Sequence, residues 1–338
     1  MQAATKTNQS VRQLSILTLA AFAAIYFFWG STYLAIKYAI ETLPPFLMAG
    51  ARFLTAGSIL YVWARLSKDY EKPSLAHWRT SFIVGTLLLM GGNGGVVLAQ
   101  HYIPSSLAAL LVATEPFWIV LLSWFWLGGN RPNWKVALGL LIGFIGVYLL
   151  IGGQNAGSAA ASGTGQILGA FLVIGAAFCW ALGSIYGVRA TTPKSSLLTS
   201  GMQMFSGGLV LTVVGSLSGE WTKFNITNVS TNSWLGLVYL IIFGSLISFT
   251  AYSYLLKVAS PSQVSTYAYI NPVVAVFLGW MIAGESFTMQ MLVGAGVIVG
   301  SVALITSHNK VEKDAAEEFK VHKSDTSTEN CKTLSASA

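Results

Sequence analysis

Long apolar stretches recur along the whole chain and are separated by short connectors that hold most of its charged residues. A helix needs roughly 20 apolar residues to cross a hydrocarbon layer of ~30 Å, whereas the strands of a spanning barrel would alternate over segments of ~10 residues. The lengths of the stretches therefore predict ten transmembrane helices. They are residues 14–36, 46–65, 80–99, 105–127, 134–152, 166–187, 197–218, 234–256, 262–283 and 288–306.

Composition leads to the same class of protein. Hydrophobic residues make up 54% of the 338 residues and charged residues only 9%, against about 25% in a soluble domain. Such a chain cannot cover itself with polar surface, so we expect an all-α polytopic membrane protein in contact with the lipid bilayer. The first stretch is too long for a cleaved signal peptide and has Trp29 and Tyr33 where a cleavage site would lie.

Charge predicts the orientation. Of the 19 Lys and Arg residues, Lys37 and Lys223 fall in connectors on one side and Arg52 falls inside a helix, and the other sixteen lie in the termini and connectors of the opposite side. Because Lys and Arg favour cytoplasmic connectors, we expect both termini to lie in the cytoplasm. The net charge of +7 follows from this placement and does not indicate a nucleic-acid partner.

Two segments outside the helices have their own composition. Residues 153–165 are rich in Gly, Ala and Ser and carry no charge, which is typical of a flexible linker, here extracytoplasmic. Residues 307–338 are polar, and we expect a disordered cytoplasmic tail.

The chain contains an internal repeat. Residues 110–129, LLVATEPFWIVLLSWFWLGG, align with residues 266–285, TYAYINPVVAVFLGWMIAGE, so that positions 156 apart correspond. A second match, at an offset of 151, aligns FFWGSTY at 27–33 with FCWALGS at 178–184. The matched pairs are Pro116 with Pro272, Glu115 with Asn271, Trp29 with Trp180, and Arg52 with Gln203.

The repeat divides the chain into halves of five predicted helices, 1–152 and 166–306. An odd number of helices per half means that the second copy crosses the membrane upside down. Inverted repeats are typical of secondary transporters, whose substrate site lies near the midplane where the repeats meet.

Glu115 and its proline neighbour point to that site. Glu115 lies about ten residues into its predicted helix, or ~15 Å at 1.5 Å per residue, and Asn271 is about as deep from the other side. Pro116 and Pro272 each free a carbonyl four residues back, which is tolerated only against protein or a wet cavity. We predict that Glu115 and Asn271 face a central cavity and that both prolines are hinges. The alternative is that Glu115 pairs with another helix and that Pro116 is an ordinary kink.

Longer stretches carry a family resemblance. FFWGSTYLAIKYAIETLPPFLMAGARFL (27–54), YIPSSLAALLVATEPFWIVLLSWFWLGG (102–129) and VASPSQVSTYAYINPVVAVFLGWMIAGE (258–285) resemble the drug/metabolite transporter superfamily in its EamA-type bacterial branch. The resemblance covers about 14–306. It implies ten helices in two inverted halves and an inner-membrane carrier, commonly an exporter of amino acids or other small metabolites. The two halves differ in that Asn271 stands opposite Glu115.

The other cavity candidates each have a structural alternative. Arg52 could snorkel outward, pair with Glu115, or bind a substrate carboxylate with its planar fork. Asn93, set among four glycines, could line the pore or tie two closely packed helices together. Gln203 could be a ligand or an interhelical hydrogen-bonder.

Aromatic residues complete the candidate set. Trp29 and Trp180 lie short of opposite membrane faces and could be interface anchors or aromatic walls of the cavity. Tyr267 and Tyr269 flank Pro272, and at a spacing of two only one of them can face the cavity; Tyr267 is the candidate.

The leading function is a secondary active transporter of small metabolites or amino acids, working by alternating access as an exporter, with proton coupling through Glu115 as one mechanism. The alternatives are a receptor or scaffold without transport and a membrane enzyme on lipid-linked substrates. The sequence has no Walker-type GxxxxGK[ST] and no HExxH or GxSxG motif, so we expect no enzyme, cofactor or metal. GxxxG spacings at Gly139–Gly143 and Gly296–Gly300 serve packing within a monomer or a homodimer face.

Overall fold

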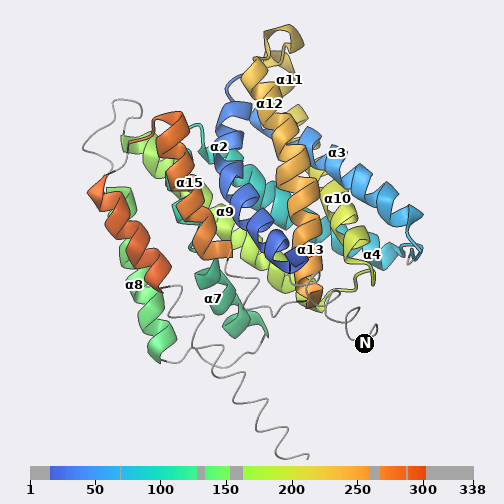
Figure 1. Ribbon diagram of the computed structural model, residues 1–338, viewed down its shortest axis with the longest axis horizontal. Helices are drawn as coiled ribbons and strands as arrows, with labels where there is room; N and C mark the ends of the chain where they lie inside the picture. The colour runs from blue at the N-terminus through green and yellow to red at the C-terminus, as the bar shows by residue number, and fades with distance from the viewer. Residues whose placement is uncertain are drawn as a thin grey trace, which may run out of the picture.

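The structure, a computed structural model, describes residues 16–68, 70–127, 134–152, 163–258, 267–286 and 288–301. Within these residues every regular element is a helix, and Figure 1 shows the helices packed side by side in one bundle. The first half contains η1 (Ile25–Trp29), α2 (Gly30–Ala39), α3 (Pro45–Leu66), α4 (Leu75–Gly85), η2 (Thr86–Gly94), α5 (Gly95–Ala99), α6 (Ser105–Val112), α7 (Glu115–Leu127) and α8 (Trp134–Gly152). The second half contains α9 (Gly163–Arg189), α10 (Ser196–Leu217), α11 (Glu220–Lys223), η4 (Ile226–Asn228), α12 (Thr231–Tyr239), η5 (Leu240–Ile247), α13 (Ser248–Val258), α15 (Tyr267–Ala283) and a helix over Met289–Ser301.

Among the described residues, seven helical segments are long and apolar enough to cross a membrane. They overlap seven of the ten predicted segments and span Ile16–Ala39, Pro45–Leu66, Leu75–Ala99, Ser105–Trp126, Thr164–Gly187, Ser196–Leu217 and Thr231–Tyr252. The other three predicted segments hold shorter apolar helices in the described residues, at Ala137–Gly146, Ile270–Ala283 and Met289–Ser301. The linker at 153–162 and the tail from 302 lie outside the described residues.

Local sequence explains where several helices begin. Ser74, Ser195 and Ser230 precede α4, α10 and α12, and each hydroxyl accepts a hydrogen bond from the backbone N–H three residues later. Such caps satisfy one of the free donors at a helix start. Pro45 opens α3, where a missing N–H has no consequence.

Three of the long spans contain π-helical turns, which are η1, η2 and η5. A π turn disturbs the regular helical hydrogen bonds and occurs frequently at functional sites. η2 and η5 begin 154 residues apart, at Thr86 and Leu240, which is within the offsets of the sequence repeat. The departures from regular helix thus recur at matched places in the two halves.

Glycines bring α3 and α10 into close contact. A Cβ at Gly50 would lie 3.2 Å from the Gly208 oxygen, and one at Gly57 would lie 3.0 Å from the Gly201 oxygen. The contact is antiparallel, because the lower number on one helix meets the higher number on the other. No larger residue fits at these crossings without moving the backbone of the neighbouring helix.

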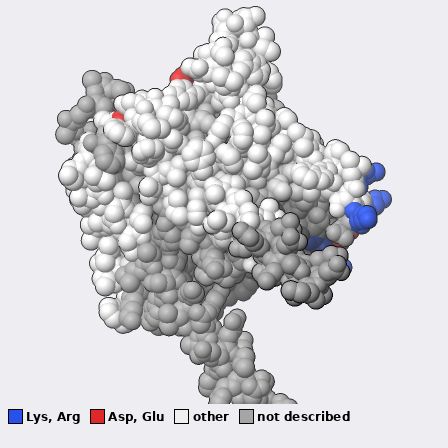
Figure 2. Space-filling view, viewed as in Figure 1, with Lys and Arg blue, Asp and Glu red and all other residues white. Residues whose placement is uncertain are grey.

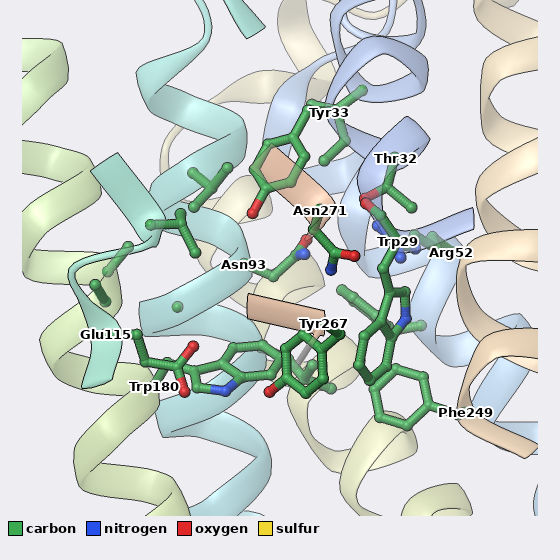
Figure 3. A pocket seen from close by; sticks show the side chains of 18 residues that line it. Trp29, Thr32, Tyr33, Arg52, Asn93, Glu115, Trp180, Phe249, Tyr267 and Asn271 are labelled. Carbon is green, nitrogen blue, oxygen red and sulfur yellow. The ribbon is translucent and has the colours of Figure 1, made fainter. Parts of the chain in front are cut away.

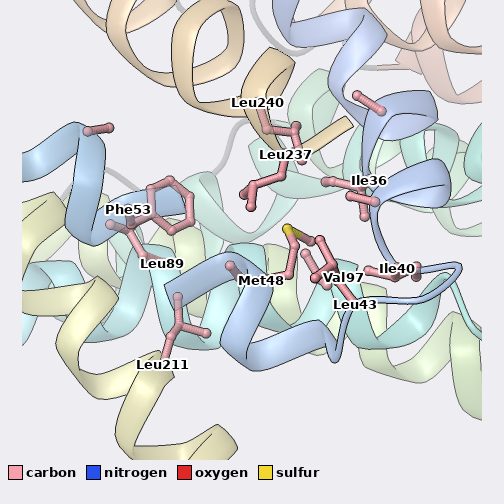
Figure 4. Close-up of a cluster of buried hydrophobic side chains, with 14 of the residues drawn as sticks. Ile36, Ile40, Leu43, Met48, Phe53, Leu89, Val97, Leu211, Leu237 and Leu240 are labelled. Carbon is pink, nitrogen blue, oxygen red and sulfur yellow. The ribbon is translucent and has the colours of Figure 1, made fainter. Parts of the chain in front are cut away.

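Buried apolar side chains fill the bundle on both sides of this crossing. One cluster, shown in Figure 4, joins α2, α3, α5, η2, α10, α12 and η5 through residues such as Ile36, Met48, Phe53, Leu211 and Leu240. Much of the outer surface is apolar as well. The face in Figure 2 shows no charged side chain over its broad described middle, and its Lys and Arg gather near the ends of α3 and α4. This distribution fits a bundle surrounded by lipid.

Candidate functional site

A cavity of about 110 Å³ lies inside the bundle and is lined by helices of both halves (Figure 3). Seven of the eight predicted cavity residues line it. They are Trp29, Arg52, Asn93, Glu115, Trp180, Tyr267 and Asn271.

Gln203 is the exception. It is absent from the cavity lining. Its carbonyl oxygen lies against Gly85, where α10 crosses α4. The repeat matches Gln203 to Arg52, but glycine contacts fix α10 so closely on α3 and α4 that position 203 belongs to the helix crossing.

Arg52 is held inside the bundle. Its side chain is only 3% exposed, so it does not snorkel to the surface. Its Nε donates a hydrogen bond to Ser245 Oγ at 3.0 Å, and its guanidinium lies 4.6 Å from the centre of the Phe53 ring. Gly244 leaves room for Arg52 Nη2, because a Cβ at this position would lie only 3.1 Å from that nitrogen.

One nitrogen of the Arg52 guanidinium has no hydrogen-bond partner among the described residues. This nitrogen, Nη1, is buried. Among the described residues, the only ion pair within 4.0 Å joins Lys37 and Glu285. Arg52 and Glu115 are therefore not paired. A buried cation with a free donor at a cavity wall is suited to an anionic group of a ligand, because leaving a charged donor unsatisfied costs free energy.

Glu115 lies at a break in its span. α6 ends at Val112, two residues form a turn, and α7 begins at Glu115. The Thr114 hydroxyl donates to the Leu111 oxygen at 2.7 Å and holds the turn. Pro116 is the second residue of α7, a position where a helix has no use for its N–H. The sequence therefore places Glu115 at the first position of a new helix, facing the cavity.

Asn271, which the repeat matches to Glu115, uses its side-chain amide for hydrogen bonds to backbone oxygens. It is 7% exposed. With the amide oriented to suit its neighbours, its nitrogen donates to the oxygen of Tyr26 at 3.1 Å and to that of Tyr267 at 3.2 Å. The acceptor in Tyr26 belongs to the π turn η1, and that in Tyr267 opens α15. Asn271 thus links two helices while lining the cavity.

Aromatic rings form one wall of the cavity. Trp29 donates from Nε1 to the Gly244 oxygen at 3.2 Å, and its ring lies against those of Phe249, Tyr252 and Tyr267 at 5.0–5.6 Å between centroids. Figure 3 shows Trp29 and Phe249 across the cavity from Glu115, with Tyr267 between them. Trp29 is therefore a wall residue and no interface anchor.

Asn93 and Trp180 are the other two predicted residues in the cavity lining. Asn93 lies in the π turn η2, and its buried Oδ1 has no partner among the described residues. Trp180 packs on Gly92, where a Cβ would be 2.9 Å from its Cε3. Glycine at 92 thus gives the indole its place in the cavity wall.

Several lining residues were missed by sequence reasoning. Tyr33, Thr32 and Phe249 line the cavity, and Ser245 holds Arg52. The i+3 and i+4 spacing of Thr32 and Tyr33 from Trp29 would have placed the first two on its helix face. Nothing in the sequence singles out Ser245 among the serines of the chain.

Together these features define a class, a polytopic helical membrane protein whose central cavity is lined by both halves of the chain and carries Arg52, Glu115, Asn93 and Asn271 in a largely apolar wall. The model of the EamA-like transporter family matches the chain twice, over residues 15–152 and 167–307. The chain belongs to this family of membrane transporters.

Similar proteins are also named as transporters. An uncharacterized inner membrane transporter, YedA of Escherichia coli K12, is 37% identical over 298 residues, which cover 87% of this chain and 92% of YedA. An uncharacterized transporter of Bacillus subtilis, YvbV, is 28% identical over 88% of this chain and 94% of its own length. A crystal structure with 21% sequence identity covers 86% of this chain and 97% of its own, with a TM-score of 0.58, and shares the fold.

Proposed function

We propose that this protein is a secondary active transporter that exports small metabolites or amino acids by alternating access. The observation that carries the proposal is the cavity itself, whose lining includes Glu115 at a helix break and Arg52, with one guanidinium nitrogen that has no partner among the described residues. Arg52 is suited to a carboxylate and Glu115 to an amine or a proton. The aromatic wall around Trp29 suits the apolar part of a substrate.

The proposed architecture is ten helices in two inverted halves, 1–152 and 166–306. The glycine contacts between α3 and α10 support it, because the offset of 151 maps Gly50 onto Gly201 and Gly57 onto Gly208. Gly50 meets Gly208 and Gly57 meets Gly201, so each half offers the same pair to the other. A self-complementary contact of this kind is what a two-fold axis produces. An axis in the membrane plane would interconvert two similar states.

Orientation is part of the proposal. The basic residues at the ends of α3 and α4 (Figure 2) support a cytoplasmic location for that end of the bundle. A periplasm-active enzyme fused to the C-terminus is expected to be silent, and the same enzyme inserted in the 153–165 linker is expected to be active. The reverse pattern would refute this orientation.

Ligand binding to the cavity can be tested without knowing the substrate. A metabolite library is screened for compounds that raise the unfolding temperature of the purified protein, since a ligand that binds only the folded state stabilises it. Zwitterions with a carboxylate are expected among the hits, and Arg52→Gln is expected to abolish their effect.

The matched control is Arg65→Gln, because Arg65 is an exposed arginine at the other end of the same helix. Hits that stabilise Arg52→Gln as strongly as Arg65→Gln would place the ligand elsewhere. Hits that bind but never exchange across proteoliposomes would favour a receptor over a transporter.

A further inference from the structure

The two spans that carry Arg52 and Glu115 begin without caps of their own. Pro44 precedes α3 and Pro104 precedes α6, and neither offers a side-chain acceptor to the free N–H groups of the first turn. Free donors at a buried helix start must find a partner. In both helices the partner is a buried glutamate from a connector of the second half.

Glu220 provides the cap for α3. Its Oε1 accepts from the N–H of Phe46 at 3.2 Å and its Oε2 from that of Leu47 at 2.9 Å. Glu220 is the first residue of α11 and is only 9% exposed. The connector between α10 and α12 is therefore tied to the helix that carries Arg52.

Glu285 makes the richer cap, on α6. Its Oε1 accepts from the N–H of Ser105 at 3.0 Å and from the hydroxyl of the same serine at 2.7 Å, and its Oε2 accepts from the N–H of Ser106 at 3.1 Å. Lys37 Nζ, from the end of α2, lies 3.1 Å from Oε1. One carboxylate thus joins α2, α6 and the connector after α15.

The backbone is shaped to present this carboxylate. Gly284 has φ of 62°, the left-handed region that favours glycine, and it turns the chain back at the end of α15. The N–H of Glu285 then reaches the Gly279 oxygen at 3.0 Å. A Cβ at Gly279 would lie 2.6 Å from Oε2, so glycine there leaves space for the side chain.

The charge of Glu285 is stable. Burial acts to raise the pKa of its carboxyl, but hydrogen bonds from Ser106 and Ser105 together with the Lys37 charge outweigh it and lower the pKa below its usual value. The group therefore remains ionised at neutral pH, and the capping contacts require no proton.

The repeat provides no equivalent at the opposite end of the bundle. Glu285 aligns with Gly129, which has no side chain to accept hydrogen bonds. At that end the described contact of this kind is weaker, since Glu71 accepts a single exposed hydrogen bond from the N–H of Lys194 at 3.1 Å. Among the described residues, the end where Glu285 lies therefore carries the richer set of such contacts.

We propose that Glu285 is a gate residue, whose carboxylate holds the outer ends of α2 and α6 against the second half and must release them before the cavity opens to that side. The proposal rests on the alternating access proposed above. α2 ends two residues after Lys37, and Ile40 and Leu43 in the turn that follows belong to the apolar cluster of Figure 4. Glu285 is distinct from the residues that line the cavity.

The test measures access to the cavity and does not require transport. The full chain, with Cys179 and Cys331 replaced by alanine, receives one cysteine at Val96, a cavity-lining residue that is 8% exposed. A membrane-impermeant maleimide is applied to spheroplasts and to inside-out vesicles. A separate Ser286→Cys variant shows which preparation exposes the Glu285 connector, because Ser286 is an exposed neighbour.

Three substitutions are compared in this background. Glu285→Ala is expected to raise the labelling rate from the Glu285 side about tenfold, equivalent to ~1.4 kcal/mol in the closed-to-open equilibrium, and to lower it from the other side. Lys37→Met removes the ion pair but leaves the helix cap and is expected to have a smaller effect of the same sign. Glu41→Gln, which neutralises an exposed glutamate near the same end, is the matched control and is expected to have none.

The outcomes separate this proposal from the proposed function. If Glu285→Ala does not fold, Glu285→Gln, which keeps one acceptor oxygen, is measured instead and is expected to raise labelling by an intermediate factor. Labelling equal to that of Glu41→Gln from both sides would overturn the gate. A shift in labelling in a protein that moves no substrate would leave the gate standing and contradict the proposed transport.

Discussion

Pro116 and Pro272 occupy matched positions, 156 residues apart, in helices that are built differently. In the first half the span is interrupted, since α6 ends at Val112 and α7 begins at Glu115. In the second half α15 continues through Pro272 without interruption. The residues before the two prolines also differ. Both line the cavity, but only Asn271 donates hydrogen bonds to backbone oxygens, one in its own helix and one in η1.

The difference indicates that two positions matched by the sequence repeat have different roles. The break at Pro116 lets a costly carboxylate face the cavity, where we propose that it meets a ligand or a proton. The amide of Asn271 uses its donors on backbone oxygens, so it fixes η1 against α15. One proline region is then available for chemistry and the other holds the bundle together.

Exchanging the two residues should break this division most severely. The double variant Glu115→Asn with Asn271→Glu keeps the same two side chains but exchanges their positions. It places the carboxylate where two backbone carbonyl oxygens need a hydrogen-bond donor. We expect substrate exchange in proteoliposomes to fall by about 100-fold or more, or ~2.7 kcal/mol. Glu115→Asp, which keeps the carboxylate in place, is the control and should retain a measurable rate. Exchange at the wild-type rate in the double variant would show that the two positions are equivalent.

The prolines provide the next test, with a smaller effect. Pro116→Ala restores an N–H that can bond to the Val112 oxygen, so α6 and α7 can join into one stiff helix. We expect exchange to slow about tenfold in this variant, or ~1.4 kcal/mol, and roughly twofold in Pro272→Ala, whose helix is already continuous. Initial rates at equal protein amounts give the comparison. Equal rates in both variants would mean that the break in the first half has no part in the cycle.

Stability should respond to the second region and not the first. Asn271→Leu removes the donor to Tyr26 and Tyr267 and is expected to lower the free energy of unfolding by about 1–3 kcal/mol. Glu115→Leu removes a side chain without a hydrogen-bond partner among the described residues and is expected to leave stability unchanged or to raise it. Unfolding of both variants in mixed micelles provides the measurement. A larger loss in Glu115→Leu would reverse the assigned roles.

Much of the site could be predicted from the sequence because polar residues inside apolar stretches are rare. Glu115, Arg52, Asn93 and Asn271 stand out against long runs of Leu, Val and Ala, and all four line the cavity. A buried polar group in a membrane needs a partner or a wet space, so residue type and depth alone are informative.

Pairwise contacts could not be predicted in this way. The sequence left open whether Arg52 meets Glu115, and in the structure its partner is Ser245 in a π turn. Gln203 failed as a cavity residue because the glycine crossing of α3 and α10 sets the rotation of its helix. Glu285 and Glu220 were overlooked because an acid at the end of an apolar run looks like an ordinary connector residue, and its role appears only when the helix start it caps is seen.

The central claim of the proposed function is that Glu115 is a working group of the cavity, and we propose that it couples transport to protons. It is tested most directly with Glu115→Gln in proteoliposomes, using a substrate found by thermal stabilisation and an imposed pH gradient. The account predicts that accumulation driven by the gradient disappears while exchange between equal substrate concentrations persists, because glutamine keeps the shape and cannot titrate. Accumulation that still follows the pH gradient in Glu115→Gln would contradict it.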